Sequence, residues 1–353
     1  MSKILFTGGG SAGHVTPNLA LMESMRSRGW KILYMGSEAG IERELVQGTD
    51  VLYLSIKTGK LRRYFSWQNF IDPFFVLWGF LQSIYLCLKH RPAVVFSKGG
   101  FVSVPVVLAA WICRIPVIAH ESDVSPGLAT RICLPFCHQL CVNFEQSLAY
   151  IPGAVVTGSP VRREILTGDR ERGLSHFGLN GEVPVLLVFG GSLGARSINK
   201  AVRDALPGLL ETFQIMHVCG AGNMDQDIGA KEGRYLQVEY VGQAFGDLLA
   251  CADMVVSRAG ANSIYELLLT RTPHLLIPLS LKASRGDQLL NARTFSREGY
   301  SHLLEEEALD GESLLASVRE VWADRELLKS RLNAYPLRDS VSEISRIIEE
   351  TAA

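Results

Sequence analysis

Two glycine-rich stretches, FTGGGSAGHVTPNL at residues 6–19 and VFGGSLGARSINKAV at residues 188–202, carry most of the information about the fold. Each follows a run of apolar, strand-forming residues and opens a helical pattern, so each predicts a strand, a tight turn and a helix. The first turn of such a helix presents backbone N–H groups to an anion. Because ligands of these folds bind at the carboxyl ends of the strands, the duplication indicates a cleft for two substrates.

The composition describes an ordered protein of two domains. Its 353 residues exceed the usual size of one domain, and 47% of them are hydrophobic. The net charge of −1 argues against a dedicated nucleic-acid binder, so we expect no nucleic-acid partner and only local phosphate binding. The seven cysteines are scattered without a disulfide pattern and no signal peptide is visible, which indicates a cytoplasmic setting.

Short apolar runs alternate with helical patterns along the whole chain, as they do in β-α-β units around parallel sheets. One series of expected strands occupies the first 157 residues and a second begins at residue 183. The pattern predicts an α/β fold of two doubly wound Rossmann-like domains facing across a cleft. We place the two domains at residues 1–158 and 159–335. A last helix at 336–353 is expected to pack back on one of the two domains, with the N-terminal domain preferred.

The first turn formally satisfies the G-x-G-x-x-G pattern of dinucleotide-binding proteins through Gly8, Gly10 and Gly13. That pattern also requires an acidic residue at the end of the second strand, to bind a ribose. Here the strand ends in Tyr34-Met35-Gly36-Ser37 without a carboxylate, so an oxidoreductase with a nicotinamide cofactor is disfavoured and we expect no cofactor. The turn still offers amide donors to a diphosphate or a sugar oxygen. Alternatively, the glycines of this turn serve only to let the helix and the strand pack closely.

The most specific stretches are SRAGANSIYE at 257–266 and PLSLKASRGDQLLNA at 278–292. The first places Glu266 one to two turns into a helix, where its carboxylate can accept both hydroxyls of a ribose. The second crowds amide and acid groups into a loop, as recognition of sugar hydroxyls requires. A capped helix and an ordinary polar loop are the plain alternative.

Together with SKGGFVS at 97–103, HESD at 120–123 and TGSPVR at 157–162, these motifs follow one another in a known order. The chain resembles the bacterial N-acetylglucosaminyltransferases that convert undecaprenyl-diphospho-N-acetylmuramoyl-pentapeptide (lipid I) into lipid II for peptidoglycan. The resemblance spans about residues 3–305. It implies a type-B glycosyltransferase fold, an acceptor bound by the N-terminal half, UDP-N-acetylglucosamine bound by the C-terminal half, and inverting transfer to the C4 hydroxyl of the acceptor.

The same resemblance assigns residues to the donor's diphosphate, base, ribose and sugar. It places Ser11, Ala12 and Gly13 toward the diphosphate and sugar, Arg162 and Ser192 on the diphosphate, Val241 on the uracil, Glu266 on the ribose, and Asp287 and Gln288 on the sugar hydroxyls. This chain has Phe101, Asp123 and Asp287 where the best-known members have Tyr, Asn and Gln. These departures lie at sugar or acceptor positions.

Three residues compete as the base that takes the proton of the acceptor hydroxyl: His14, Glu121 and Asp123. His14 is our narrow favourite because it follows the glycine turn and because histidine side chains ionise near neutral pH. Its plain alternative is a helix-capping histidine. The two carboxylates follow an expected strand and approach the same edge of the sheet.

Two acidic or thiol clusters do not predict a metal site. The D-x-D stretch at 225–227 lies in a loop typical of the surface, and the cysteines and histidine between 133 and 141 match no zinc spacing. We therefore expect no protein-bound metal.

The apolar stretch FFVLWGFLQSIYLCL at 74–88 is too short to span a membrane comfortably. It follows Lys57, Lys60, Arg62 and Arg63, which are interleaved with aromatic residues, a mixture that suits an anionic lipid surface. We expect peripheral binding at the cytoplasmic face of the cell membrane; an ordinary core helix is the plain alternative. Rival functions are transfer to another lipid or small-molecule acceptor, UDP-sugar epimerisation and non-catalytic membrane docking.

Overall fold

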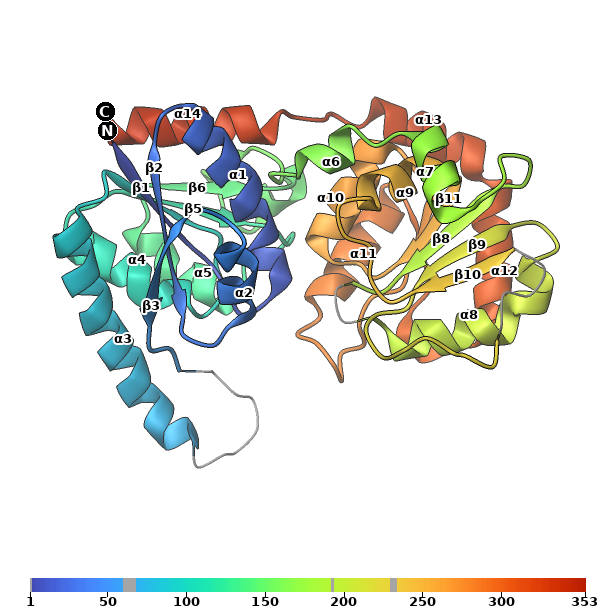
Figure 1. Ribbon diagram of the computed structural model, residues 1–353, viewed down its shortest axis with the longest axis horizontal. Coiled ribbons are helices and arrows are strands. Elements are labelled where there is room, and N and C mark those ends of the chain that lie inside the picture. The colour runs from blue at the N-terminus through green and yellow to red at the C-terminus, as the bar shows by residue number, and fades with distance from the viewer. Residues whose placement is uncertain (1, 60–67, 192–193, 229–233) are drawn as a thin grey trace. The chain divides into compact units, whose positions relative to one another are not determined.

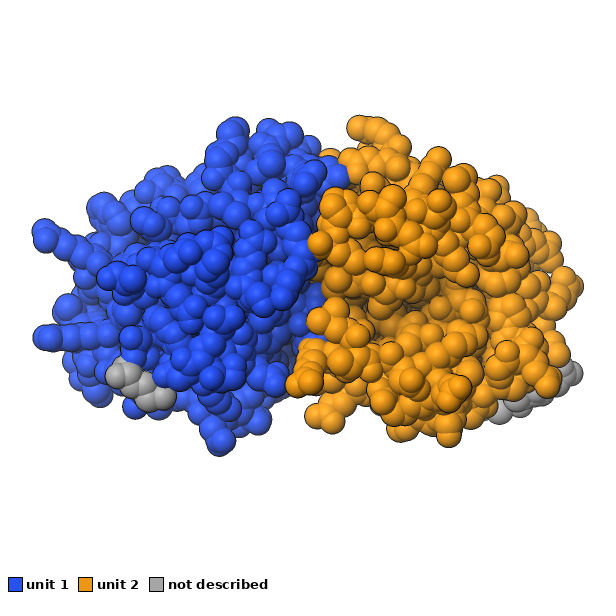
Figure 2. All heavy atoms as spheres, turned by 90° about the horizontal axis from the view of Figure 1, so that it is seen from above, with its two compact units in different colours: residues 1–162, 338–353 blue, residues 163–337 orange. Residues whose placement is uncertain are grey.

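The computed structural model describes residues 2–59, 68–191, 194–228 and 234–353, with the side chains of 68–73 left out. The chain forms two compact units, coloured separately in Figure 2. The first unit contains Met1–Arg162 and Arg338–Ala353, and the second contains Arg163–Leu337.

The first unit is built on one parallel sheet, with helices on both faces (Figure 1). Its strands are β1 (Lys3–Thr7), β2 (Lys31–Ser37), β3 (Leu52–Ile56), β4 (Val94–Ser97), β5 (Val117–Glu121), β6 (Gln139–Val142) and β7 (Val155–Val156). They lie in the order β3-β2-β1-β4-β5-β6-β7, and every neighbouring pair of these described strands is parallel. Its helices are α1 (Thr16–Ser27), α2 (Ile41–Gln47), α3 (Gln68–His90), α4 (Ser103–Ile112), α5 (Leu128–Cys133) and α14 (Ser340–Ala352).

The alternation of strand side chains divides the core of this unit into two layers. Ile4, Phe6 and Phe96 pack with α1, α2 and α14, whereas Leu5 and Val95 pack with α3, α4 and α5. The last helix of the chain, α14, thus covers the same face of the sheet as the first helix. Within the described residues no helix combines the length and the apolar character needed to cross a bilayer.

The second unit repeats this architecture (Figure 1). Its strands are β8 (Val185–Phe189), β9 (Gln214–Val218), β10 (Tyr235–Val238), β11 (Met254–Ser257), β12 (His274–Leu276) and β13 (His302–Leu303), in the parallel order β10-β9-β8-β11-β12-β13. Its helices are α6 (Arg163–Leu166), α7 (Arg170–Phe177), α8 (Arg196–Leu209), α9 (Phe245–Cys251), α10 (Ala261–Thr270), α11 (Asp287–Arg297), α12 (Gly311–Ala323) and α13 (Arg325–Ala334).

Both sheets have the doubly wound order that the alternating pattern predicted, so the predicted α/β class with two Rossmann-like domains is confirmed. In each sheet the winding direction reverses between two neighbouring strands, β1 and β4 in the first unit and β8 and β11 in the second. Ligands of such sheets bind outside the carboxyl ends of the strands at this reversal point. Both glycine-rich turns follow a strand at such a point.

Candidate active site

The first glycine turn is packed so closely that side chains would not fit. Gly10 has a φ of +85°, and a Cβ atom there would lie 2.6 Å from the ring of Phe101. A Cβ atom on Gly9 would lie 2.6 Å from the carboxyl carbon of Glu42. These glycines therefore let the turn approach two neighbouring segments, the SKGGF stretch and α2.

Glu42, a residue that sequence reasoning missed, lies under this turn. Its side chain is fully buried and accepts hydrogen bonds from the amides of Gly10 (3.2 Å) and Ser37 (3.0 Å). The Gly10 amide is thus already used within the protein. The sequence signal was faint, because Glu42 lies inside α2, five residues after the end of β2, and not at the strand end where a ribose-binding acid is expected.

His14 ends the short 3₁₀ helix η1 (Ala12–His14) and is half-buried, while Ser11 and Gly13 are exposed. Its Nδ1 lies 3.1 Å from the carbonyl oxygen of Gly9 and 3.0 Å from Ser11 Oγ. Because a carbonyl oxygen only accepts, Nδ1 carries the hydrogen, and in the neutral ring the lone pair lies on Nε2. This arrangement leaves the His14 ring in the tautomer that a base acting through Nε2 requires.

Glu121 and Asp123 follow β5 in the same unit. The Glu121 carboxylate accepts hydrogen bonds from the amides of Ser122 (2.8 Å), Asp123 (3.2 Å) and Gly127 (3.0 Å) and from Thr130 Oγ1 (2.6 Å). It is 7% exposed. We infer that Glu121 shapes the turn that presents Asp123, which is half-buried.

The SKGGF turn after β4 lies between the first glycine turn, which carries His14, and the end of β5, which carries Glu121 and Asp123. Gly100 has a φ of +82°, and a Cβ atom there would lie 2.2 Å from the Gly9 carbonyl oxygen and 3.1 Å from His14 Nδ1. The first glycine turn, His14 and the SKGGF turn therefore meet at the reversal point between β1 and β4. Adjacent to them, across β4, lies the end of β5.

The second glycine turn precedes α8, but the predicted diphosphate ligand Ser192 lies outside the described residues. On either side of it, Gly191 and Gly194 have φ of +88° and +73°. A Cβ atom on Gly194 would lie 2.1 Å from the Cys219 carbonyl oxygen, so this turn also needs glycine for close approach. The other predicted diphosphate ligand, Arg162, is the last residue of the N-terminal segment of the first unit. Its buried Nε lacks a hydrogen-bond partner among the described residues.

Arg258 holds the loops at the carboxyl edge of the second sheet together. Its Nη1 donates to the carbonyl oxygens of Ile277 and Pro278, at 3.2 Å each, and its Nη2 donates to Ser197 Oγ at 2.9 Å and to Glu306 Oε1. These groups come from the segment after β12, from α8 and from the 3₁₀ helix η5 (Glu306–Ala308). The sequence marked the motif around Arg258 but did not reveal this role.

Glu306 completes that cluster. Its other oxygen accepts from the Ser280 amide at 2.9 Å. Burial raises the pKa of Glu306, but the hydrogen bonds from Ser197, Arg258 and Ser280 together outweigh it and hold the pKa below its usual range. Glu306 is therefore an ionised partner of a buried arginine.

The predicted sugar-binding residues begin α11. Gln288 accepts a hydrogen bond from the Leu279 amide through Oε1 (3.1 Å), which orients its amide group, and Asp287 Oδ2 lies 3.5 Å from Arg285 Nη2. The predicted ribose ligand Glu266 is half-buried in α10. All three residues thus lie on helices that follow β11 or β12.

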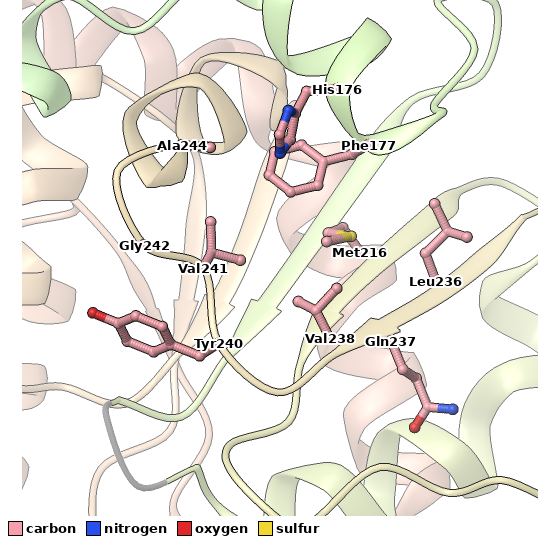
Figure 3. Close-up of a pocket in the computed structure, with 10 residues that line it drawn as sticks. All are labelled: His176, Phe177, Met216, Leu236, Gln237, Val238, Tyr240, Val241, Gly242 and Ala244. Carbon is pink, nitrogen blue, oxygen red and sulfur yellow. The ribbon is translucent and has the colours of Figure 1, made fainter.

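Val241 lines a hollow of about 410 Å³ beside β9 and β10. Figure 3 shows its other walls, which include Phe177, Met216 and Val238, and shows the Tyr240 ring pointing away from them.

In the D-x-D stretch, Asp225 faces Arg203, with Oδ2 4.0 Å from Nε. In the part of the chain that the structure describes, no three His, Cys, Asp or Glu side chains form a group that could hold a metal ion.

Two doubly wound units, each with a glycine turn at its reversal point, are the architecture of the type-B glycosyltransferases. Residues 4–142 match the N-terminal domain of glycosyltransferase family 28, and residues 185–347 match the C-terminal domain of that family. The chain belongs to glycosyltransferase family 28.

Relatives of known activity resemble the chain over its whole length. It is 48% identical to the UDP-N-acetylglucosamine–N-acetylmuramyl-(pentapeptide) pyrophosphoryl-undecaprenol N-acetylglucosamine transferase of Clostridium kluyveri, with 99% of both chains covered. It is 49% identical to transferase 2 of the same name from Bacillus anthracis, covering 99% of this chain and 100% of the relative.

Solved structures share the fold. The crystal structure of Acinetobacter baumannii MurG has a TM-score of 0.77 at 21% identity, with 99% of this chain and 100% of that chain covered. The glycosyltransferase of kitacinnamycin has a TM-score of 0.76 at 17% identity, with 100% and 99% covered. At these identities the likeness concerns the fold.

Proposed function

We propose that this glycosyltransferase moves N-acetylglucosamine from UDP-N-acetylglucosamine to the C4 hydroxyl of the N-acetylmuramoyl unit of lipid I, giving lipid II. One observation carries the proposal: nearly half of the residues, over nearly the whole chain, are shared with transferases whose names state this donor and acceptor. The anomeric carbon is inverted in a single displacement. The bond from this carbon to the UDP oxygen breaks as the bond to the acceptor oxygen forms.

The second unit is the proposed donor site. Glu266 binds the ribose hydroxyls, Asp287 and Gln288 bind the sugar hydroxyls, and Val241 packs on the uracil. The orientation of Gln288 by the Leu279 amide supports this assignment, because a preoriented amide loses less freedom on binding. The negative charge that develops on the leaving UDP is stabilised by Arg162 and by the N-terminus of α8.

The first unit is the proposed acceptor site, and His14 is the proposed base. The acceptor's C4 hydroxyl gives its proton to Nε2 of His14 as the new bond forms. The contact between Nδ1 and the Gly9 carbonyl supports this role, because it selects the tautomer with a lone pair on Nε2. Asp123 is the alternative base, and Ser11, Ala12 and Gly13 face the diphosphate and sugar of the donor.

The acceptor's lipid chain requires a membrane surface, and we propose that the helices α3, α4 and α5 provide the docking face. α3 packs on α4, which packs on α5. All three expose large apolar side chains that a lipid interface would cover. They include Phe74, Leu77, Trp78 and Tyr85 on α3, Trp111 and Ile112 on α4, and Leu128 and Ile132 on α5. The basic residues Lys60, Arg62 and Arg63, which we expect to contact anionic lipid, lie outside the described residues.

Product analysis tests the proposed reaction. The protein is incubated with radiolabelled UDP-N-acetylglucosamine and either lipid I, a lipid-free analogue of it or an unrelated glycolipid, and the products are identified by mass spectrometry. We expect one added N-acetylhexosamine on lipid I. Transfer only to the unrelated glycolipid would show that the acceptor is not lipid I. Conversion of the UDP-sugar without any acceptor would show that the reaction is epimerisation and not transfer.

A further inference from the structure

A buried lysine lies beneath the acceptor-side loops. Lys98 directly follows β4, is 1% exposed, and its backbone amide donates to the Thr7 carbonyl at the end of β1 (2.9 Å). A Cβ atom on Gly8 would lie 3.1 Å from the Cβ of Lys98, so the lysine stem packs directly on the first glycine turn. Burying an ammonium group costs free energy unless it is paired. Lys98 takes no part in the proposed donor or acceptor contacts.

The ammonium of Lys98 selects one form of His120. Lys98 Nζ lies 2.7 Å from His120 Nδ1 and also donates to Ser122 Oγ. On the other side of the ring, His120 Nε2 lies 2.9 Å from the carbonyl oxygen of Gly158, which only accepts. Nε2 therefore carries the hydrogen, and the lone pair on Nδ1 accepts from Lys98. These contacts connect the SKGGF turn, the HESD segment and the start of the TGSPVR segment.

The charges around Lys98 come from the neighbouring strands. Burial has the largest effect and lowers the pKa of Lys98 to about 8, whereas Glu121 and Asp123, at and after the end of β5, favour its protonated form. The Cys141 thiol on β6, whose pKa burial raises to about 12, is uncharged near pH 7. Burial, and next the charge of Lys98, hold the pKa of His120 well below its usual range. Near pH 7 the pair is thus a charged lysine beside a neutral histidine.

We propose that Lys98 is a positioning residue of the transfer reaction: its ammonium holds His120 and the Ser122–Asp123 turn in place. The inference rests on the proposed function. Lys98 does not touch substrate, because its side chain is buried; it acts through the turns that carry His14 and Asp123. A shift of about 1 Å in such groups can lower a rate on the order of a hundredfold.

The test compares Lys98→Met, which keeps the length of the side chain without its charge, with Lys3→Met as a matched control. Lys3 lies at the opposite end of the same sheet, where its Nζ donates to the His90 carbonyl at 2.8 Å. We expect Lys98→Met to lower kcat with lipid I by roughly tenfold to a hundredfold. The calorimetric affinity for UDP should not change, and Lys3→Met should keep the kcat of the wild type.

The pH profile separates this role from a structural one. As pH rises through about 8, Lys98 loses its proton, so kcat of the wild type should fall, and Lys98→Met should lack this fall. The stability contributed by Lys98 should rise from about pH 8 to the unfolded value near 10.4, because the unfolded chain binds the extra proton there. Urea unfolding measured over the same pH range separates lost activity from unfolding.

A wild-type profile without a fall near pH 8, or a Lys98→Met enzyme with the kcat and profile of the wild type, would overturn the inference. If Lys98→Met does not fold, a wild-type profile without a fall near pH 8 still overturns the inference. If the wild type itself forms no product from lipid I, the proposed function fails first, and the inference fails with it. Product formation by the wild type therefore identifies which of the two has failed.

Discussion

Replacing Arg258 by Met should loosen the carboxyl edge of the second sheet far more than an ordinary surface substitution does. The Arg258 side chain is 8% exposed and that of Glu306 is 16% exposed, so their ion pair lies largely out of water. Removing one partner of a buried pair typically costs about 3–5 kcal/mol, because the remaining charge is left uncompensated. Here the carbonyl oxygens of Ile277 and Pro278 also lose their donor.

Hydrogen exchange of the intact protein measures this effect segment by segment. At 1.4 kcal/mol per factor of ten, a cost of 3–5 kcal/mol accelerates exchange by roughly 10²- to 4 × 10³-fold in amides that open with the cluster. We expect this in peptides from 254–264, 275–290 and 302–308, while peptides from the first unit should exchange as in the wild type. UDP affinity should fall too, since the Leu279 amide that orients Gln288 lies in the loosened segment.

A matched control is available in the same unit. Arg293 pairs with Glu305 at 2.7 Å, but the two side chains are 51% and 40% exposed. Pairs of this kind are worth about 0–1 kcal/mol, so Arg293→Met should change exchange by less than about tenfold. The double variant Arg258→Met with Glu306→Leu should recover part of the lost protection, because no unpaired charge remains.

Acid adds an independent check on the cluster. The folded-state pKa of Glu306 is lowered, so its contribution to stability is present above the unfolded value near 4.3 and is lost as pH falls through the lower folded value. Glu306→Gln should remove this part of the acid dependence of urea unfolding. Equal protection in Arg258→Met and the wild type, or equal losses in Arg258→Met and Arg293→Met, would refute the reasoning.

The other predictions concern the base, the donor and the membrane. His14→Ala should lower kcat at least about a hundredfold with unchanged UDP affinity; if it keeps most of its kcat while Asp123→Ala loses it, the base is the carboxylate. Glu266→Ala should weaken UDP binding roughly tenfold to over a hundredfold, because one charged contact is lost. An unchanged calorimetric affinity would show that Glu266 does not bind the ribose. Replacing Trp78 and Trp111 by Ser should shift the protein from sedimenting anionic vesicles into the supernatant without changing turnover of a soluble acceptor analogue. Equal sedimentation of this variant would contradict docking through α3 and α4.

The sequence by itself determined the fold class and the location of both glycine turns. These features are local: strand and helix periods are read within one segment, and tight turns such as Gly10 and Gly194 need glycine for their own backbone angles and close contacts. The parallel crossovers then bring the ends of β1, β4, β8 and β11 to the carboxyl edges of the two sheets. Motif order was enough to identify the family.

Only the tertiary structure decided which side chains support these turns. Lys98 meets His120 because β4 and β5 are neighbours, Arg258 meets Glu306 across 48 residues of chain, and Glu42 reaches Gly10 from a helix after β2. A local pattern carries no signal for such pairs, because a buried charge is stable only beside a partner that the chain supplies from elsewhere. The order of strands in the sheet decides which partner that is, and sequence order along the chain does not.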